Sequence, residues 1–158
     1  MPATHTSDGS AGYRRDANAR AYFQKHKPEL DALFLSVSGE STIQFVAADW
    51  AGYGSDAKDQ KHIACSLLLK KIGAQFLRQD GGDFEVYFWG KGCAVCHDSF
   101  KGFAHIKSLP SFLKKNYAKV VDSLSDDFLP RGKYAPVEDG TYLVPIGDDW
   151  YLIRWECG

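Results

Sequence analysis

The stretch from Lys61 to His97 constrains this chain more than any other, because it holds three of the four cysteines and two of the five histidines. It begins with a His-x-x-Cys, formed by His62 and Cys65, in a helical pattern of apolar residues. A run typical of a β-strand then leads into a Cys-x-x-Cys, formed by Cys93 and Cys96. Imidazole and thiolate groups are common zinc ligands, and a Cys-x-x-Cys is also a redox spacing. The stretch therefore predicts a metal or redox centre.

Composition predicts one packed domain. The 158 residues fit a single core, and a hydrophobic share of 44% with an aromatic share of 14% is typical of a globular protein. Residues 1–12 are rich in Thr, Ser, Gly and Ala. We therefore expect a flexible, linker-like head over residues 1–12 and a single domain over residues 13–158.

Charge and hydropathy exclude several classes of protein. The formal net charge of -1 excludes a broad electropositive surface, so nucleic-acid binding is permitted but not indicated. No apolar run approaches the length of a membrane span, and the N-terminus lacks the charged-then-apolar order of a signal peptide. We expect a soluble, unprocessed protein. Four cysteines are too few for a disulfide scaffold, which favours a reducing compartment.

The first third of the chain predicts a helix, a hairpin and a loop. Helical periodicity covers Tyr13 to Gln24, and we expect that helix to end near Pro28. The runs LFLSVS and TIQFVA, separated by a Gly-Glu-Ser turn, favour two strands. The segment from Ala48 to Lys61 is rich in turn residues and is predicted to be a loop; its aromatic residues, Trp50 and Tyr53, follow no core periodicity.

The chemically rich stretch predicts a helix, a strand and a second helix. Asp56 is a suitable N-cap for a helix that runs to about Leu77, where a Gly-Gly segment follows, so His62 lies in its first two turns. The run from Phe84 to Trp89 shows little alternation and predicts a central strand covered on both faces. A helix is then expected from Cys93 to about Ile106. The segment from Phe112 to Leu124 predicts further helix or a short strand.

Two of the four possible metal or redox centres use the Cys-x-x-Cys without His62 or Cys65. Cys93, Cys96 and His97 match the Cys-x-x-Cys-His of c-type haem attachment, but that chemistry needs export and the only methionine is Met1. The Phe-Trp strand end just before the pair is typical of a thioredoxin-type redox site. Too few residues follow the pair for the remaining strands of that fold.

The other two centres are zinc sites. A closed structural site would use His62, Cys65, Cys93 and Cys96 as a tetrahedral Cys₃His set, and the bland alternative is that these are simply core cysteines. A catalytic site would use only His62, Cys93 and Cys96, which leaves the fourth position for water.

The catalytic arrangement resembles the zinc-dependent cytidine deaminase superfamily, whose signature is a His-x-Glu followed by a Pro-Cys-x-x-Cys. The match covers His62, Cys93 and Cys96 and the helix-strand-helix order around them. The resemblance implies that these three residues hold Zn²⁺. It also implies an α/β fold of three layers, with a mixed central sheet of about five strands and helices on both faces. The end of the chain, Thr141 to Ile146 and Trp150 to Trp155, predicts the antiparallel hairpin that closes this fold.

Two positions depart from the signature. Ala64 stands where the family has the glutamate that moves protons, and Gly92 stands where many members have proline. Without the carboxylate a rate contribution of roughly 10² to 10⁴ is lost, so we expect the chain as written to be nearly inactive. It is either a natural pseudoenzyme or a chain in which Glu was replaced by Ala to disarm a toxic activity.

The resemblance to bacterial deaminase toxin domains implies a function. It implies deamination of cytosine in nucleic acid, with DNA favoured, by the toxin domain of a secreted bacterial effector that acts in the target-cell cytoplasm, and an immunity protein as partner. Trp50, Tyr53, Trp89 and Lys91 are the expected substrate contacts, although Trp89 also fits a core position and Trp50 a loop anchor. The alternatives are a free nucleoside or nucleotide deaminase and a non-catalytic, zinc-stabilised binding module.

Overall fold

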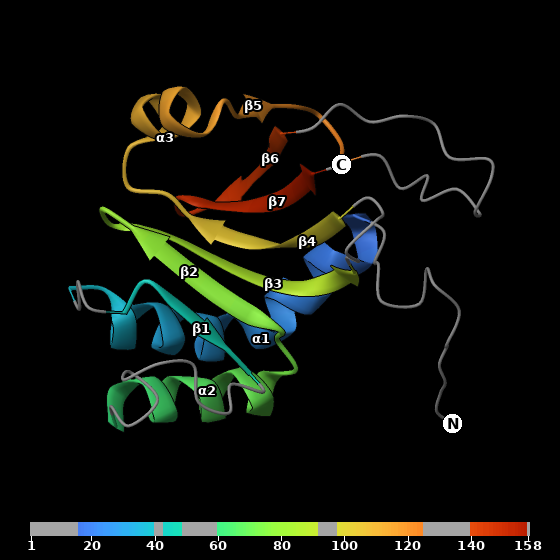
Figure 1. The fold of residues 1–158 in the computed structure, drawn as a ribbon. Coiled ribbons are helices and arrows are strands. Elements are labelled where there is room, and N and C mark those ends of the chain that lie inside the picture. The colour runs from blue at the N-terminus through green and yellow to red at the C-terminus, as the bar shows by residue number, and fades with distance from the viewer. Residues whose placement is uncertain (1–15, 40–42, 49–59, 92–97, 125–139, 158) are drawn as a thin grey trace.

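The computed structural model describes residues 16–39, 43–48, 60–91, 98–124 and 140–157. These residues form three helices and a single seven-stranded sheet of strand order β1-β2-β3-β4-β7-β6-β5 (Figure 1). The helices are α1 (Asp16–Val37), α2 (Gln60–Ile72) and α3 (Leu109–Asn116), and the strands are β1 (Phe45–Ala47), β2 (Phe76–Asp80), β3 (Asp83–Lys91), β4 (Asp98–His105), β5 (Lys119–Val120), β6 (Gly140–Gly147) and β7 (Trp150–Cys157). The mixed α/β class is confirmed. The sheet has seven strands rather than about five, and only β5 and β6 pair in parallel.

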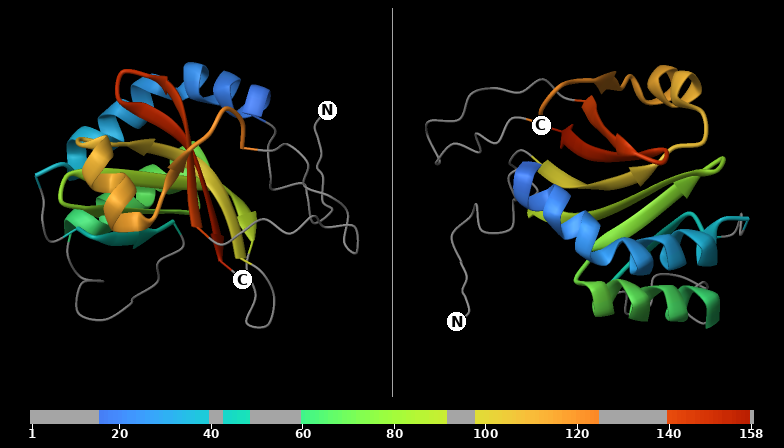
Figure 2. Two further views of the ribbon diagram at one scale, coloured as in Figure 1. Left: turned by 90° about the horizontal axis from the view of Figure 1, so that it is seen from above. Right: turned by 180° about the vertical axis from the view of Figure 1, so that it is seen from behind.

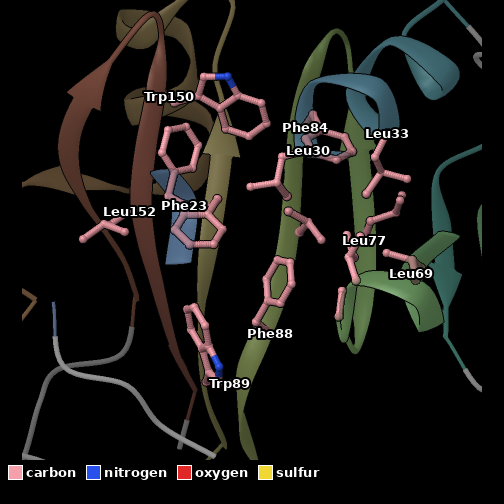
Figure 3. Packing of buried hydrophobic residues seen from close by; sticks show 14 of the residues in the cluster. Phe23, Leu30, Leu33, Leu69, Leu77, Phe84, Phe88, Trp89, Trp150 and Leu152 are labelled. Atoms are coloured by element: carbon pink, nitrogen blue, oxygen red, sulfur yellow. The ribbon is translucent and has the colours of Figure 1, made fainter. Parts of the chain in front are cut away.

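Helices cover both faces of the sheet, as expected (Figure 2). Successive residues of a strand point to opposite faces, so the partners of Leu152 and Ile153 identify the two layers. Leu152 belongs to the larger core, which also holds residues of α1 and α2, whereas Ile153 belongs to a second cluster with Phe112 of α3. Figure 3 shows the larger core, in which Phe23 and Leu69 pack toward the sheet.

The first helix is much longer than expected. It continues through Pro28 to Val37, so the prediction of a helix end near Pro28 followed by a hairpin strand is wrong. Proline in a helix interior costs about 3 kcal/mol or more. Here the proline is exposed, while Phe23, Leu30 and Leu33 on the same helix are buried in the core. Burial of this apolar stripe outweighs the local preference for a break.

The helix that carries His62 is shorter than expected. It ends at Ile72, where Gly73 adopts a left-handed φ of 80°, and it does not reach Leu77. Leu77 lies instead in β2, which forms a hairpin with β3. The two-residue turn is Gly81-Gly82, with φ values of 60° and 97°, which suits glycine and matches the twist of the paired strands.

The helix expected to begin at Cys93 is wrong at least from Asp98 onward, because Asp98–His105 forms β4, antiparallel to both β3 and β7. The prediction of a central strand covered on both faces is confirmed, since every residue from Phe84 to Trp89 is buried. A β-bulge between Tyr87 and Trp89 explains the missing alternation. It lets Phe88 and Trp89 both enter the larger core.

The remaining predictions concern the two ends of the chain. The C-terminal hairpin is confirmed as β6 and β7, which are antiparallel neighbours. The uncertain segment that precedes it contains α3 and the short strand β5. The predicted head, residues 1–12, lies outside the described residues. No helix in the described ranges is long and apolar enough to cross a membrane.

Candidate functional site

The histidine of the predicted zinc site lies where the sequence places it along the chain. α2 begins at Gln60, so His62 is in its first turn, and its side chain is 4% exposed. Ala64 is exposed on the same helix. Cys65 is 3% exposed among the core residues, and burial raises the pKa of its thiol to about 12. Cys65 is therefore protonated at neutral pH and packs as a small apolar side chain.

The helix carries His62 away from the strand end that precedes Cys93. The C-terminal end of α2 is the end near that strand, because Gln75, just after it, donates from Nε2 to the carbonyl oxygen of Gly90 at 3.3 Å. His62 lies ten residues before Ile72, which is about 15 Å along a helix axis. The described residues thus do not bring His62 beside the end of β3.

The other predicted site residues differ in what the structure says of them. Cys93, Cys96, Trp50 and Tyr53 lie outside the described residues, and for Lys91 only the backbone, as the last residue of β3, is described. Trp89 is 8% exposed and packs edge-on against Tyr22, with ring centroids 5.4 Å apart. Trp89 is therefore a core residue, which is the structural alternative to the predicted substrate contact.

The described residues alone hold no cluster of three or more His, Cys, Asp or Glu side chains able to bind a metal ion. Their geometry therefore does not demonstrate a fit for zinc. The ligand set His62, Cys93 and Cys96 stays a prediction from residue spacing.

Four rings from four strands form a row on the α3 side of the sheet, and we call Phe45, Phe76, Phe100 and Trp155 the aromatic row. Phe76 stacks on Phe45 with centroids 5.5 Å apart and meets Phe100 edge-on at 5.3 Å. Phe100 stacks on Trp155 at 5.6 Å and 21° between the planes. Phe45 is 46% exposed and the other three rings are partly exposed. Aromatic side chains joined in this way on a sheet surface are a candidate binding site.

α3 lies toward the other end of this face. Lys115 of α3 forms an ion pair with Asp80, beside the β2–β3 turn. Phe76 is the first residue of β2, and the register pairs Phe100 with Gly90 and with Trp155, far from that turn. The helix therefore covers the turn end of the face, and the aromatic row occupies the opposite end.

A buried polar group adjoins the aromatic row. Nε of Arg78 donates to Oε1 of Glu85 at 3.1 Å, and the hydroxyl of Tyr87 donates to the same oxygen at 2.6 Å. The Arg78 guanidinium also lies 5.0 Å from the ring centroid of Trp155, a cation–π distance. Burial and then the charge of Glu85 raise the pKa of Tyr87, so this phenol stays protonated and acts as a donor.

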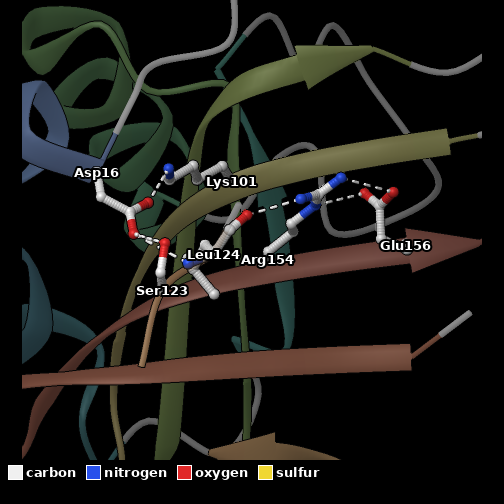
Figure 4. Close-up of polar contacts among 6 residues, drawn as sticks. All are labelled: Asp16, Lys101, Ser123, Leu124, Arg154 and Glu156. Atoms are coloured by element: carbon white, nitrogen blue, oxygen red, sulfur yellow. Dashed lines mark hydrogen bonds and ion pairs between the residues drawn. The ribbon is translucent and has the colours of Figure 1, made fainter. Parts of the chain in front are cut away.

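A second polar network lies on the α1 side of the sheet (Figure 4). Lys101, fully buried, pairs with Asp16 at the start of α1, and Asp16 also accepts from the backbone N–H of Leu124 at 2.9 Å. Arg154 donates to the carbonyl oxygen of Leu124 at 2.7 Å and pairs with Glu156 at 3.1 Å. These contacts tie α1, β4, β7 and the segment after β5 together. We assign the network a structural role, because each charge has an opposite charge beside it.

Comparisons with protein-family models, curated proteins and solved structures gave no match to this chain.

Sequence reasoning missed the aromatic row and its polar neighbours, although part of the signal is present. Gly81-Gly82 between two short apolar runs is a two-residue hairpin signal. Once that turn is recognised, counting outward from it pairs Arg78 with Glu85 and Phe76 with Tyr87, as the structure shows. No local signal brings Trp155 to this group, because β7 follows more than sixty residues later.

Proposed function

We propose that this chain is a non-catalytic binding module that holds single-stranded nucleic acid by stacking bases on the aromatic row. The observation that carries the proposal is the row itself, in which partly exposed rings of β1, β2, β4 and β7 contact one another across the sheet. Bases of single strands stack on aromatic side chains of sheet surfaces in several nucleic-acid-binding folds. Zinc bound by Cys93 and Cys96 would stabilise such a module and belongs to the same proposal.

The charge of the chain predicts the character of this binding. A net charge of -1 excludes a broad basic surface for phosphates, and the Arg78 guanidinium is already paired with Glu85. Stacking, which is worth about 1–3 kcal/mol per base, therefore has to supply most of the affinity. Binding is expected to be modest and to weaken only slightly as salt increases.

Fluorescence anisotropy with a short labelled single strand tests the proposal. Phe45→Ala and Trp155→Ala are each expected to weaken binding about fivefold or more, since each removes a stacking surface. Phe45 is the safer variant because it is 46% exposed on an edge strand. Tyr117→Asn is the matched control: Tyr117 is 87% exposed, lies outside the aromatic row, and has a left-handed φ of 51° that asparagine tolerates. Absence of binding, or equal affinity in all variants, contradicts the proposal.

A second candidate is the deaminase activity that the resemblance implies. The position of His62 in the first turn of α2 favours it, whereas the distance of His62 from the β3 end counts against it. In this candidate His62, Cys93 and Cys96 hold zinc, the substrate is cytosine in DNA, and the chain is the toxin domain of a secreted effector countered by an immunity protein.

Restoring the carboxylate tests the second candidate. Ala64→Glu is expected to be tolerated, because Ala64 is exposed and glutamate is favourable in the first turns of a helix. The variant would be assayed with single- and double-stranded DNA, RNA and free nucleosides. Deamination of nucleosides alone would favour the free-nucleoside alternative, and no product with any substrate would exclude the candidate.

A further inference from the structure

One carboxylate oxygen of Glu85 has no hydrogen-bond donor within the part of the chain that the structure describes. Glu85 is 5% exposed and lies two residues before Tyr87, on the same α3-side face. Arg78 and Tyr87 both donate to Oε1, and neither they nor any other described residue donates to Oε2. Oε2 is not among the buried side-chain atoms that lack a partner, so it keeps some contact with solvent and is an acceptor that a ligand can reach.

The residues around Glu85 indicate which kind of ligand group can donate a hydrogen bond to Oε2. The aromatic row adjoins it, because Phe76 stacks on Tyr87 at 4.9 Å and Arg78 lies over Trp155. A second cation on these rings would meet the guanidinium of Arg78, which already neutralises Glu85. A neutral N–H donor on a flat ring fits both features, because the ring stacks on the row while its edge donates to Oε2.

We infer that Glu85 makes the aromatic row selective for bases with an exocyclic amino group, which are adenine, cytosine and guanine, over thymine and uracil. The inference rests on the proposed single-strand binding. The exocyclic amino group of adenine, cytosine or guanine projects beyond the ring edge and can donate to Oε2, although ring acceptors flank it on both sides in adenine and on one side in cytosine and guanine. The N3–H of thymine or uracil stands between two carbonyl oxygens, which repel a carboxylate.

Competition between homopolymers and a matched base analogue tests this selectivity on the unaltered protein. Oligo-dC is expected to bind about fivefold or more tightly than oligo-dT, since a hydrogen bond to a charged group is involved. Oligomers in which 2-pyrimidinone, which lacks the amino group, replaces cytosine are expected to fall to the oligo-dT level. Equal binding of cytosine and 2-pyrimidinone oligomers overturns the inference and leaves the proposed function intact. Failure to bind any oligomer overturns the proposed function itself.

A variant then assigns the selectivity to the residue. Glu85→Gln replaces one carboxylate oxygen with an NH₂ group and keeps the shape of the side chain. It is expected to lose the preference for oligo-dC while retaining oligo-dT binding. A preference that persists in a folded Glu85→Gln protein overturns the role of Glu85. If this variant does not melt cooperatively, the 2-pyrimidinone comparison on the wild type decides the question alone.

Discussion

The imidazole of His105 stacks on the ring of Phe34, with ring centroids 4.1 Å apart and 27° between the planes. Trp150 meets the same imidazole edge-on at 5.1 Å. Nδ1 of His105 is buried, and no described residue forms a hydrogen bond with it. Burial lowers the pKa of His105, and the nearby carboxylates of Asp149 and Asp31 oppose this only in part. The folded protein therefore holds His105 as a neutral, apolar-packed ring.

This histidine predicts acid sensitivity. Its pKa is lower in the folded state than in the unfolded chain, where it is about 6.5, so the unfolded state binds more protons below that pH. The stabilising contribution of neutral His105 is complete above about pH 6.5 and is lost as the pH falls below it. Urea unfolding between pH 8 and pH 5 is expected to show this loss, and His105→Phe is expected to reduce it. His26→Gln, at a histidine of α1, should leave the slope in place; an unchanged slope in His105→Phe contradicts the assignment.

The buried pair of Lys101 and Asp16 predicts a strong non-additivity (Figure 4). Asp16→Ala leaves the fully buried ammonium of Lys101 without this partner and is expected to cost about 3–5 kcal/mol of unfolding free energy. The double variant Asp16→Ala with Lys101→Met removes both charges and is expected to be more stable than Asp16→Ala alone. Urea unfolding measures the unfolding free energy of Asp16→Ala, of Lys101→Met and of the double variant. If the double variant loses as much unfolding free energy as the two single variants together, the pair is not coupled.

The β6–β7 turn predicts a stabilising substitution. Asp148 and Asp149 have left-handed φ values of 56° and 65°, which aspartate tolerates better than most L residues but which glycine adopts without the steric cost of a Cβ. Asp149→Gly is expected to raise stability by about 0.5–1 kcal/mol, or roughly 1–4 °C in Tm. The matched control is Gly82→Ala in the β2–β3 turn, where φ is 97°, and it should lower Tm. A fall in Tm for Asp149→Gly would show that the aspartate side chain makes a needed contact.

Cys65 predicts the outcome of a zinc measurement. Its thiol is buried with a pKa raised to about 12, and thiolates rather than thiols bind zinc. If the purified protein holds zinc, Cys65→Ala is expected to leave the zinc content unchanged, whereas Cys96→Ser is expected to reduce it. Mass spectrometry of the metal content checks this. Loss of zinc in Cys65→Ala would instead support the closed Cys₃His site, and loss in His62→Ala would support the deaminase ligand set.

Residue patterns by themselves determined the elements in which local preference and tertiary burial agree. The apolar run of β3, the C-terminal hairpin and the helix around His62 follow from patterns of a few neighbouring residues. In β3 and the hairpin, most of the apolar side chains that the pattern selects are buried. In α2 the pattern predicted the helix but not its inward face, because Ile63 and Leu67 are exposed while His62 and Cys65 are buried.

Tertiary structure alone decided the elements in which local sequence preference and burial in the core conflict. α1 passes Pro28 because Leu30 and Leu33 gain more from burial than the proline costs, and the energy of that burial depends on a sheet formed by later residues. Asp98–His105 is a strand because it pairs with β3 on one side and β7 on the other. The aromatic row likewise joins Phe45 to Trp155 through contacts between strands far apart in the chain. No periodicity within a single strand encodes such contacts, because they arise only when the register of the whole sheet is set.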